Sequence, residues 1–330
     1  MLAPDSGSIP RDKLSSSLKS RLLTDGRRVG LKPEKGWAMR NYRYLSGSVL
    51  PALISPRERK LHAGPPIFGP LASHEIEVVW IGHASFLVRT PGFNVLIDPV
   101  WAKWMGPLKR QRDPGIDIEH LPPIDLVLIT HAHFDHLCRT TLKRILDGTQ
   151  TVVVPHGVSR VVRKLNVARV EEMSDWDCVR FRDAEIYFTP AHHWGARYIH
   201  DTKKGFGGFV IKLPEHTAYH SGDSAYFDGF AEIGARYDIH TALLPIGAYD
   251  CPSGREVHMN PEEAIQAFFD LKANRMIPMH HATFPISNEH RLEPLKRLHE
   301  AVSVHHLDSR VISPREGEQV ILSSLNPKIT

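Results

Sequence analysis

Short apolar runs separated by turn residues begin near residue 75 and recur to about residue 280. Their length and content of Val, Ile, Leu and aromatic residues predict β-strands. Helical patterns fall between several of these runs, so the chain first meanders and then alternates strand with helix. That order predicts two sheets covered by helices. The predicted strands are 76–81, 85–88, 94–97, 125–129, 151–154, 185–189, 207–213, 217–221, 240–244 and 276–279.

One helix has a well-marked start. Asn260 stands at the N-cap position, Pro261 follows at the first helical position, and Glu262 and Glu263 occupy the first turn. Apolar residues at 264, 265, 268 and 269 then share one face. Caps, an N-terminal proline and early acidic residues all favour helix initiation, so the pattern predicts a helix from residue 261.

The first 70 residues differ from the rest. Residues 1–35 are rich in Ser, Lys, Arg, Gly and Pro and show no sustained period, which predicts a flexible or wrapping arm. Residues 36–70 hold Trp37, Tyr42 and Tyr44 and an apolar run at 49–54. We expect these groups to pack against the main domain, with a shallow membrane contact as the alternative. The predicted organisation is an N-terminal extension over 1–70 and a catalytic domain over 71–330.

Composition gives little information about the class of protein or its cellular compartment. The chain has 330 residues, 42% hydrophobic and 24% charged, and a net charge of +4, as in ordinary globular proteins. The sequence contains no strongly basic tract, so we do not expect it to bind nucleic acid. The three cysteines, Cys138, Cys178 and Cys251, form no paired spacing, and no stretch has the length of a membrane span. We therefore expect a cytoplasmic protein; its oligomeric state stays open.

Candidate chemistry is concentrated directly after the predicted strand 125–129. The sequence Thr-His-Ala-His-Phe-Asp-His at 130–136 offers four side chains able to bind metal within six positions. Imidazole and carboxylate together suit zinc and similar divalent ions. Alternation along an extended chain would send His131 and His133 to one side. We expect Asp135 and His136 to begin the following helix and reach a second point.

Three later segments also follow predicted strands, so their loops can converge on the same rim. Each would be an ordinary turn by itself, but together they supply the ligands that two metal ions would still lack. The segments contain the doublet His192 and His193, the turn residue Asp223, and the doublet His280 and His281.

This order of motifs resembles the metallo-β-lactamase superfamily over about residues 75–295. More narrowly, it resembles the branch containing N-acyl-phosphatidylethanolamine-hydrolysing phospholipase D. The resemblance implies an α/β fold: an αββα four-layer sandwich of two mixed β-sheets with helices on the outer faces. The matching segments include Trp-Ile-Gly-His-Ala at 80–84, Ile-Asp-Pro at 97–99, Leu-Pro-Pro-Ile-Asp at 121–125, Gly-Asp-Ser-Ala-Tyr at 222–226, Pro-Ile-Gly-Ala-Tyr at 245–249 and Asn-Glu-His at 288–290.

The same resemblance implies a ligand set for two Zn²⁺ ions, with other divalent metals as alternatives. His193 is preferred over His192 because Trp194 follows it, and His280 over His281 because a small-Thr-Phe run follows one residue later. Asp223 would bridge the two ions. The first ion would be held by His131, His133 and His193, and the second by Asp135, His136 and His280.

The implied function is a zinc-dependent hydrolase acting through a shared hydroxide. A phosphodiesterase of phospholipase D type is favoured, with N-acyl-phosphatidylethanolamine or a related phosphodiester as substrate. The alternative is a lactonase or other carboxyl-ester hydrolase using the same ions. Partners would be a small-molecule or lipid substrate, with peripheral membrane contact as an option. The catalytic candidates are Asp135, Asp223 and His258, and the substrate-binding candidates are Tyr249, His258 and His281.

Three weaker expectations concern residues outside this set. Asp98 is a candidate acceptor for a ligand imidazole, with a turn cap as the alternative. His83 is expected to be buried and hydrogen-bonded rather than a ligand. Residues 101–112 mix aromatic and basic side chains; a solvated loop is the simpler interpretation, and reception of an anionic substrate by Lys109, Arg110 and Arg112 is the sharper one.

Overall fold

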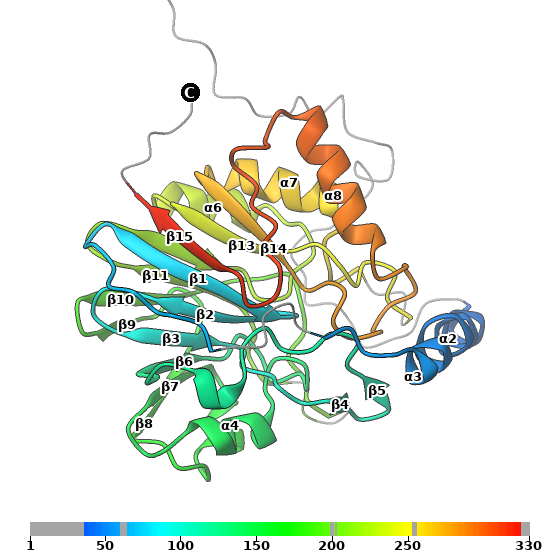
Figure 1. Ribbon diagram of the computed structural model, residues 1–330, viewed down its shortest axis with the longest axis horizontal. Helices are drawn as coiled ribbons and strands as arrows, with labels where there is room; N and C mark the ends of the chain where they lie inside the picture. The colour runs from blue at the N-terminus through cyan, green and yellow to red at the C-terminus, as the bar shows by residue number, and fades with distance from the viewer. Residues whose placement is uncertain (1–35, 60–64, 199–200, 202, 253–255, 325–330) are drawn as a thin grey trace, which may run out of the picture.

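Two β-sheets lie face to face at the centre of the molecule (Figure 1). This computed structural model describes residues 36–59, 65–198, 201, 203–252 and 256–324. The arm predicted over 1–35 lies outside the described residues. Apolar side chains from both sheets, among them Trp80, Phe86, Phe188 and Phe209, meet in the buried layer between them. The predicted pair of sheets is confirmed.

The first sheet has seven strands in the order β15-β1-β2-β3-β6-β7-β8. Its β15, β1, β2 and β3 pair antiparallel, whereas β3, β6, β7 and β8 pair parallel, so the sheet is mixed. The strands are β1 (Glu75–Gly82), β2 (Ser85–Arg89), β3 (Asn94–Ile97), β6 (Leu126–Leu128), β7 (Thr151–Pro155), β8 (Arg169–Met173) and β15 (Gln319–Ser323).

The second sheet has six strands in the order β14-β13-β12-β11-β10-β9 and is also mixed. Here β14, β13 and β12 run parallel, and the remaining neighbours are antiparallel. A separate short hairpin joins β4 (Trp104–Met105) to β5 (Leu108–Lys109). The strands of the second sheet are β9 (Cys178–Phe181), β10 (Ala184–Thr189), β11 (Gly208–Lys212), β12 (Thr217–His220), β13 (Thr241–Pro245) and β14 (Arg275–Met279).

Helices cover the outer face of each sheet, completing the predicted four layers. Apolar residues of α4 (Arg139–Ile145) and α5 (Ser159–Val162) pack on the first sheet. The second sheet is covered by α6 (Gly229–Arg236), α7 (Pro261–Asp270) and α8 (Glu293–Val304). At the start of α7, Asn260 and Glu263 form a reciprocal capping box, which confirms the predicted helix start. A short 3₁₀ turn spans Ile118–His120.

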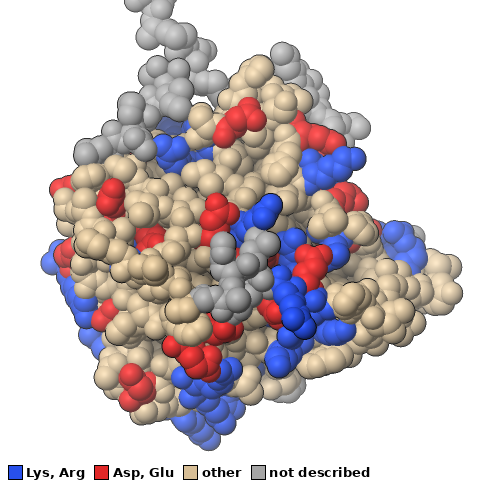
Figure 2. Space-filling view, viewed as in Figure 1, with Lys and Arg blue, Asp and Glu red and all other residues tan. Residues whose placement is uncertain are grey.

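Residues 36–59 form a helical arm that projects beside the β4–β5 hairpin (Figure 1). The arm comprises α2 (Trp37–Tyr44), a π-helical turn η2 (Leu45–Val49) and α3 (Leu50–Ile54). The wide turn precedes Pro51, which lacks the amide needed for a regular helical hydrogen bond. In Figure 2 the projection is mostly tan, with Lys and Arg side chains gathered beside its base.

Two further features bear on the expectations from sequence. None of the helices in the described part of the chain is both long and apolar enough to cross a bilayer. In the described part of the chain, Cys138, Cys178 and Cys251 take part in no disulfide.

Candidate metal centre

The motif-bearing loops all leave the ends of strands at one rim of the sandwich. The segment 130–136 follows β6, His193 follows β10, Asp223 follows β12 and His280 follows β14. Within each sheet, the carboxyl ends of parallel strands lie at one edge. The loops after β6 in the first sheet and after β12 and β14 in the second sheet therefore meet at the same rim of the sandwich. The structure thus brings together all seven residues predicted as metal ligands.

The first donor group consists of His131, His133, His193 and Asp223, whose ligand atoms lie within 4.8 Å of one another. His131 Nε2 lies 2.9 Å from His133 Nδ1, and His193 Nε2 lies 3.3 Å from that same atom. Main-chain Val257 O accepts from His193 Nδ1 at 3.1 Å, which leaves Nε2 of His193 as the bare nitrogen. Three imidazole nitrogens therefore point at one position.

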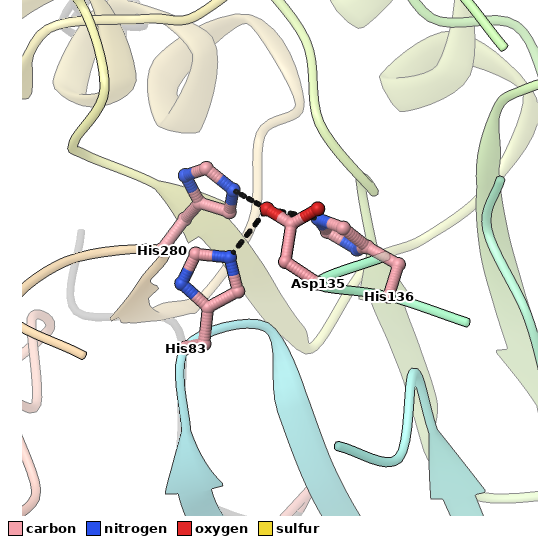
Figure 3. A group of neighbouring side chains, drawn as sticks. All are labelled: His83, Asp135, His136 and His280. Atoms are coloured by element: carbon pink, nitrogen blue, oxygen red, sulfur yellow. Dashed lines mark hydrogen bonds and ion pairs between the residues drawn. The ribbon is translucent and has the colours of Figure 1, made fainter. Parts of the chain in front are cut away.

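The second donor group consists of His83, Asp135, His136 and His280 (Figure 3). Asp135 Oδ2 lies 3.8 Å from His136 Nε2 and 3.7 Å from His280 Nε2. His83 comes from the β1–β2 turn, and its Nε2 donates to Asp135 Oδ2 at 2.9 Å. The prediction that His83 is buried and hydrogen-bonded is confirmed, but sequence reasoning did not place it inside the donor group.

Asp223 lies between the two groups. Its Oδ2 is 3.1 Å from Nε2 of both His136 and His280, and 3.7 Å from His131 Nε2. Its other oxygen, Oδ1, is buried and has no hydrogen-bond partner in the described structure. This is the geometry expected of a carboxylate shared by two metal positions.

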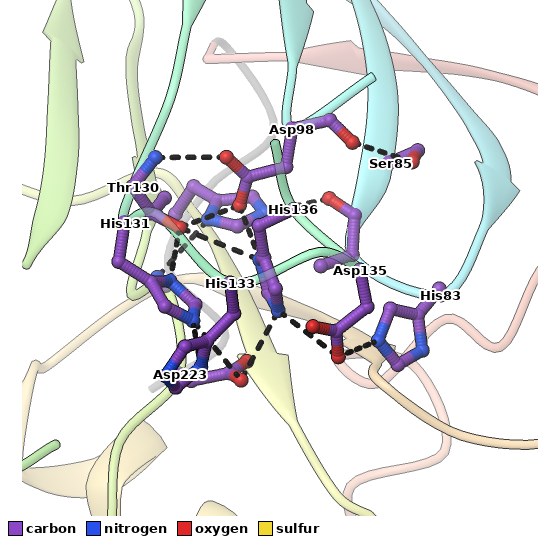
Figure 4. A network of polar contacts seen from close by, with 12 residues as sticks. His83, Ser85, Asp98, Thr130, His131, His133, Asp135, His136 and Asp223 are labelled. Atoms are coloured by element: carbon purple, nitrogen blue, oxygen red, sulfur yellow. Dashed lines mark hydrogen bonds and ion pairs between the residues drawn. The ribbon is translucent and has the colours of Figure 1, made fainter. Parts of the chain in front are cut away.

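Asp98 anchors the ligand loop from behind (Figure 4). Its Oδ2 accepts from His136 Nδ1 at 2.6 Å and from Thr130 Oγ1 at 2.6 Å, while Oδ1 accepts from the Thr130 amide at 2.8 Å. Thr130 Oγ1 lies 3.0 Å from His131 Nδ1. These contacts place the imidazole protons on Nδ1 and leave Nε2 of both histidines free for a metal. The predicted acceptor role of Asp98 is confirmed.

In each histidine doublet, one residue belongs to a donor group of the described structure and its neighbour does not. His193 is buried in the first group, whereas His192 is half-buried and bonds through its backbone to Ser224. His280 belongs to the second group, whereas the His281 ring stacks on Trp80 at 4.7 Å. His281 also lines a cavity beside the second group. The left-handed backbone at His280, with φ of 61°, turns consecutive side chains to different surroundings.

Of the remaining candidates, one joins the centre and one does not. The His258 ring stacks on His280 at 5.0 Å, and its Nδ1 lies 3.9 Å from Asp223 Oδ2, forming a third donor group with these two residues. Tyr249 instead donates through its hydroxyl to Glu293 at 2.8 Å, and Arg297 covers its ring. Tyr249 belongs to neither the donor groups nor the lined cavity found in the described residues.

Two expectations about local structure are wrong. Asp135 and His136 do not begin a helix: the segment 134–136 is a turn, and α4 begins at Arg139. The turn is closed by the His136 and Leu137 amides, which both donate to His133 O, so the second ligand pair is set by a tight turn and not by helical spacing. The second wrong expectation concerns the basic residues of the segment 101–112.

The basic side chains of Lys109, Arg110 and Arg112 make hydrogen bonds and ion pairs with other parts of the protein. Lys109 Nζ donates to Leu53 O and Ser55 O, and Arg112 pairs with Glu58 and Glu316. Arg110 is buried and donates to Val100 O and Ala102 O. These internal contacts lend no support to the hypothesis that the three residues receive an anionic substrate, which stays a prediction, whereas the burial of Arg110 contradicts a solvated loop at that residue.

Burial dominates the electrostatics of the first group. It lowers the pKa of His131 and His193 well below the ordinary value and that of His133 to about 4. Neutral imidazoles keep their lone pairs, which is the form in which histidine binds metal.

Carboxylates dominate the second group. Burial opposes charge on His136 and His280, but Asp223 and its acidic neighbours outweigh it, so the pKa of His136 is raised and that of His280 rises to about 9. Conversely, the nearby histidines hold the pKa of Asp135 and Asp223 well below the ordinary value despite burial. The two carboxylates therefore stay ionised and hold a second proton on His136 and on His280, which a metal ion would displace on binding.

The residues fit divalent metal ions. Nε2 of His136, Nε2 of His280 and Oδ1 of Asp223 are buried without hydrogen-bond partners, an arrangement that is costly unless another group satisfies them. Nitrogen and carboxylate donors at this spacing are those that zinc takes. Two ions would satisfy these atoms, with Asp223 facing both.

Comparison with known proteins places this geometry in a family. A family model described as the β-lactamase superfamily domain matches residues 93–281, more than half of the chain. The chain belongs to the metallo-β-lactamase superfamily. A solved metallo hydrolase of Ignicoccus hospitalis shares the superfamily fold, with 24% identity, a TM-score of 0.57, and coverage of 76% of this chain and 99% of that one.

Two curated relatives extend the comparison. A metal-dependent hydrolase of Pyrobaculum arsenaticum is 35% identical over 69% of this chain and 93% of its own length. An N-acyl-phosphatidylethanolamine-hydrolysing phospholipase D of Caenorhabditis elegans is 30% identical over 67% of this chain and 68% of its own length. With its superfamily membership and its donor groups, the chain is a metal-dependent hydrolase of this superfamily.

Proposed function

We propose that the chain is a dinuclear zinc phosphodiesterase of phospholipase D type, acting on N-acyl-phosphatidylethanolamine or a related phosphodiester. The observation that carries the proposal is the shared carboxylate: Asp223 Oδ2 faces both donor groups, which provides for two ions and not one. The likeness to the Caenorhabditis elegans phospholipase D supports a phosphodiester substrate. When bound, a pair of zinc ions would lower the pKa of water and polarise a phosphoryl oxygen.

The chain's own residues would hold and move protons around that centre. Asp135 receives a hydrogen bond from His83, so its carboxylate has a fixed direction in which to orient an attacking water. His258 lies three residues before α7, at the edge of the centre, where a neutral imidazole with a pKa lowered by burial to about 3 would interact with the leaving group. Its position beside Asp223 supports this role.

Parallel assays test the proposal. The protein reconstituted with zinc would be offered bis(p-nitrophenyl) phosphate, N-acyl-phosphatidylethanolamine and a panel of lactones. We expect turnover of the two phosphodiesters, about two zinc ions per chain by elemental analysis, and loss of activity in Asp223→Asn. The matched control is His192→Asn, which alters the histidine outside the donor groups. Turnover of lactones alone would replace the proposal with the carboxyl-ester alternative.

We also propose that the helical arm touches a lipid surface. Met39, Tyr42, Leu50 and Ile54 are exposed on it, Ile54 by 88%, and the same arm borders the cavity beside the second group. Exposed apolar side chains on a short helix favour shallow insertion. We expect Ile54→Asp to reduce sedimentation with phospholipid vesicles, and Val304→Asp, on the distant α8, to leave it unchanged. Equal sedimentation of both variants would contradict this contact.

A further inference from the structure

A cavity of about 270 Å³ opens beside the second donor group. His83 and His280 belong to its lining, so the cavity reaches the metal centre. One wall is formed by residues of the arm, among them Ser48, Pro51 and Ala52, and the other by the loop 282–291 after β14. The arm residues lie outside the segment 93–281 that matches the superfamily model.

The arm is fastened across the rim. Tyr44 donates through its hydroxyl to Pro285 O at 2.8 Å, joining the two walls at one end. At the other end Glu58 pairs with Arg291 at 2.5 Å and with Arg112 at 2.9 Å. Between them, Gln111 Nε2 donates to Ala52 O at 3.2 Å. Contacts at both ends and the middle fix the width of the cavity.

Several polar side chains around the cavity are committed to internal bonds. Glu289 accepts from the Ala248 amide at 2.6 Å, from the Asp250 amide at 3.2 Å and from the Ser287 hydroxyl. Gln111 is held by main-chain carbonyls and Arg291 by Glu58. The side chains between α3 and the loop 282–286 are apolar, namely Pro51, Ala52, Ala282, Phe284, Pro285 and Ile286, whereas Ser48, Ser55, Asn288 and His290 give the rest of the cavity polar groups.

We propose that residues 48–55 form a specificity wall, with an apolar chain of the substrate lying between α3 and the loop 282–286. The reacting group would then stand at the inner end, beside His83 and His280. The chemistry of that reacting group rests on the proposed function, but recognition of the chain does not. A ligand pocket characteristically has an apolar enclosure with polar groups at the point of reaction, and the part of this cavity between α3 and the loop 282–286 has that character.

The test compares chain length in wall variants. Ala52 is 7% exposed and lines the cavity, whereas Val304, at the C-terminal end of α8, is 72% exposed and does not line it. Ala52→Phe would be compared with Val304→Phe on p-nitrophenyl phosphodiesters carrying a methyl or an octyl group. We expect Ala52→Phe to lower kcat/KM for the octyl substrate about tenfold or more, with little change for the methyl substrate and in zinc content. Val304→Phe should change none of these.

A second variant guards against misfolding of the first. Ser48→Trp fills the cavity from a half-buried position and should give the same chain-length effect. An equal loss of kcat/KM on both substrates, in folded variants with full zinc content, would contradict the proposed specificity wall. The same alkyl series on p-nitrophenyl carboxylic esters separates this result from the proposed function. Chain-length selection on esters, without phosphodiester turnover, would reject the phosphodiesterase and retain the wall.

Discussion

Strand β12 has buried histidines at both ends, and the two ends behave differently. Before the strand, His216 is 1% exposed, with Nε2 lying 3.1 Å from Thr241 Oγ1 and its ring 5.0 Å from that of His240. After the strand, Asp223 faces the histidines of the metal centre. Both ends therefore place buried imidazoles close to other imidazoles.

The difference lies in what their polar atoms face. At the centre, carboxylate oxygens lie within 4 Å of several imidazole nitrogens. At the other end, a hydroxyl faces His216, and no donor group found in the described residues includes it. Clustered histidines alone thus do not mark a metal site; convergence on shared carboxylates does. Four predictions test this distinction, in order of expected effect.

The largest effect is expected at Asp223. Asp223→Ala removes the carboxylate that faces both groups, so we expect loss of both ions and a fall in hydrolysis of about 100-fold or more. Zinc content by elemental analysis, with activity beside it, measures this. The control, His192→Ala, should keep the metal because His192 belongs to no donor group in the described residues. If Asp223→Ala still held two ions, the conclusion that shared carboxylates mark the metal site would be wrong.

Asp98 is expected to have a smaller effect because it acts through another residue. Asp98→Asn weakens the acceptor for His136 Nδ1 and Thr130, so the imidazole is less well fixed. We expect zinc affinity to fall about 10- to 100-fold, measured by competition with a chelator. Asp125→Asn, at a carboxylate that pairs with Arg182 away from the donor groups, is the control. Unchanged affinity in Asp98→Asn would mean that the tautomer of His136 needs no carboxylate.

His83 offers a finer test. Its Nε2 donates to Asp135, so His83→Phe should loosen that carboxylate and lower zinc affinity roughly tenfold. His83→Gln retains an amide donor of similar reach and should restore most of the loss. If instead Gln and Phe were equally damaging and zinc content dropped by one ion per chain, His83 would be a ligand and not a positioning residue.

The ligand segment 130–136 and the strand before it were largely predictable from sequence. His131, His133, Asp135 and His136 follow an unmistakable apolar strand, and buried strands carry a strong hydrophobic pattern. Sequence reasoning missed the two-residue strands β4 and β5 of the short hairpin. It also missed β8, β9 and β15, which end their sheets and are partly exposed, so their residues need not be apolar.

Other parts of the site depend on contacts that a single sequence does not contain. His83 lies more than 50 positions from Asp135, and only the pairing of β1 with β2 beside β3 brings them together. The cavity wall depends on the docking of residues 36–59, whose apolar groups predicted packing but not its location. One signal could have drawn attention to His83: a histidine in a Gly-His-Ala turn between two strong strands.

The smallest effect concerns His216, which should influence stability and not metal. Burial, reinforced by His240, lowers the pKa of His216 to about 3, against about 6.5 in an unfolded chain. The unfolded state therefore binds the extra proton between these values. The stabilisation from neutral His216 is complete above pH 6.5 and is lost as the pH falls towards 3, by about 1.4 kcal/mol at pH 5.5.

His216→Asn should therefore lose about 1.4 kcal/mol less than the parent protein in free energy of unfolding between pH 7.5 and 5.5, measured in urea. Because both proteins keep the metal centre, the acid sensitivity of its histidines cancels in the difference. His156→Asn replaces an exposed histidine, with a side chain 73% exposed, and should leave the pH dependence unchanged. Zinc content should match the parent in both variants. A loss of zinc in His216→Asn would show that the two ends of β12 are coupled and that the separation drawn between packing and ligand histidines does not hold.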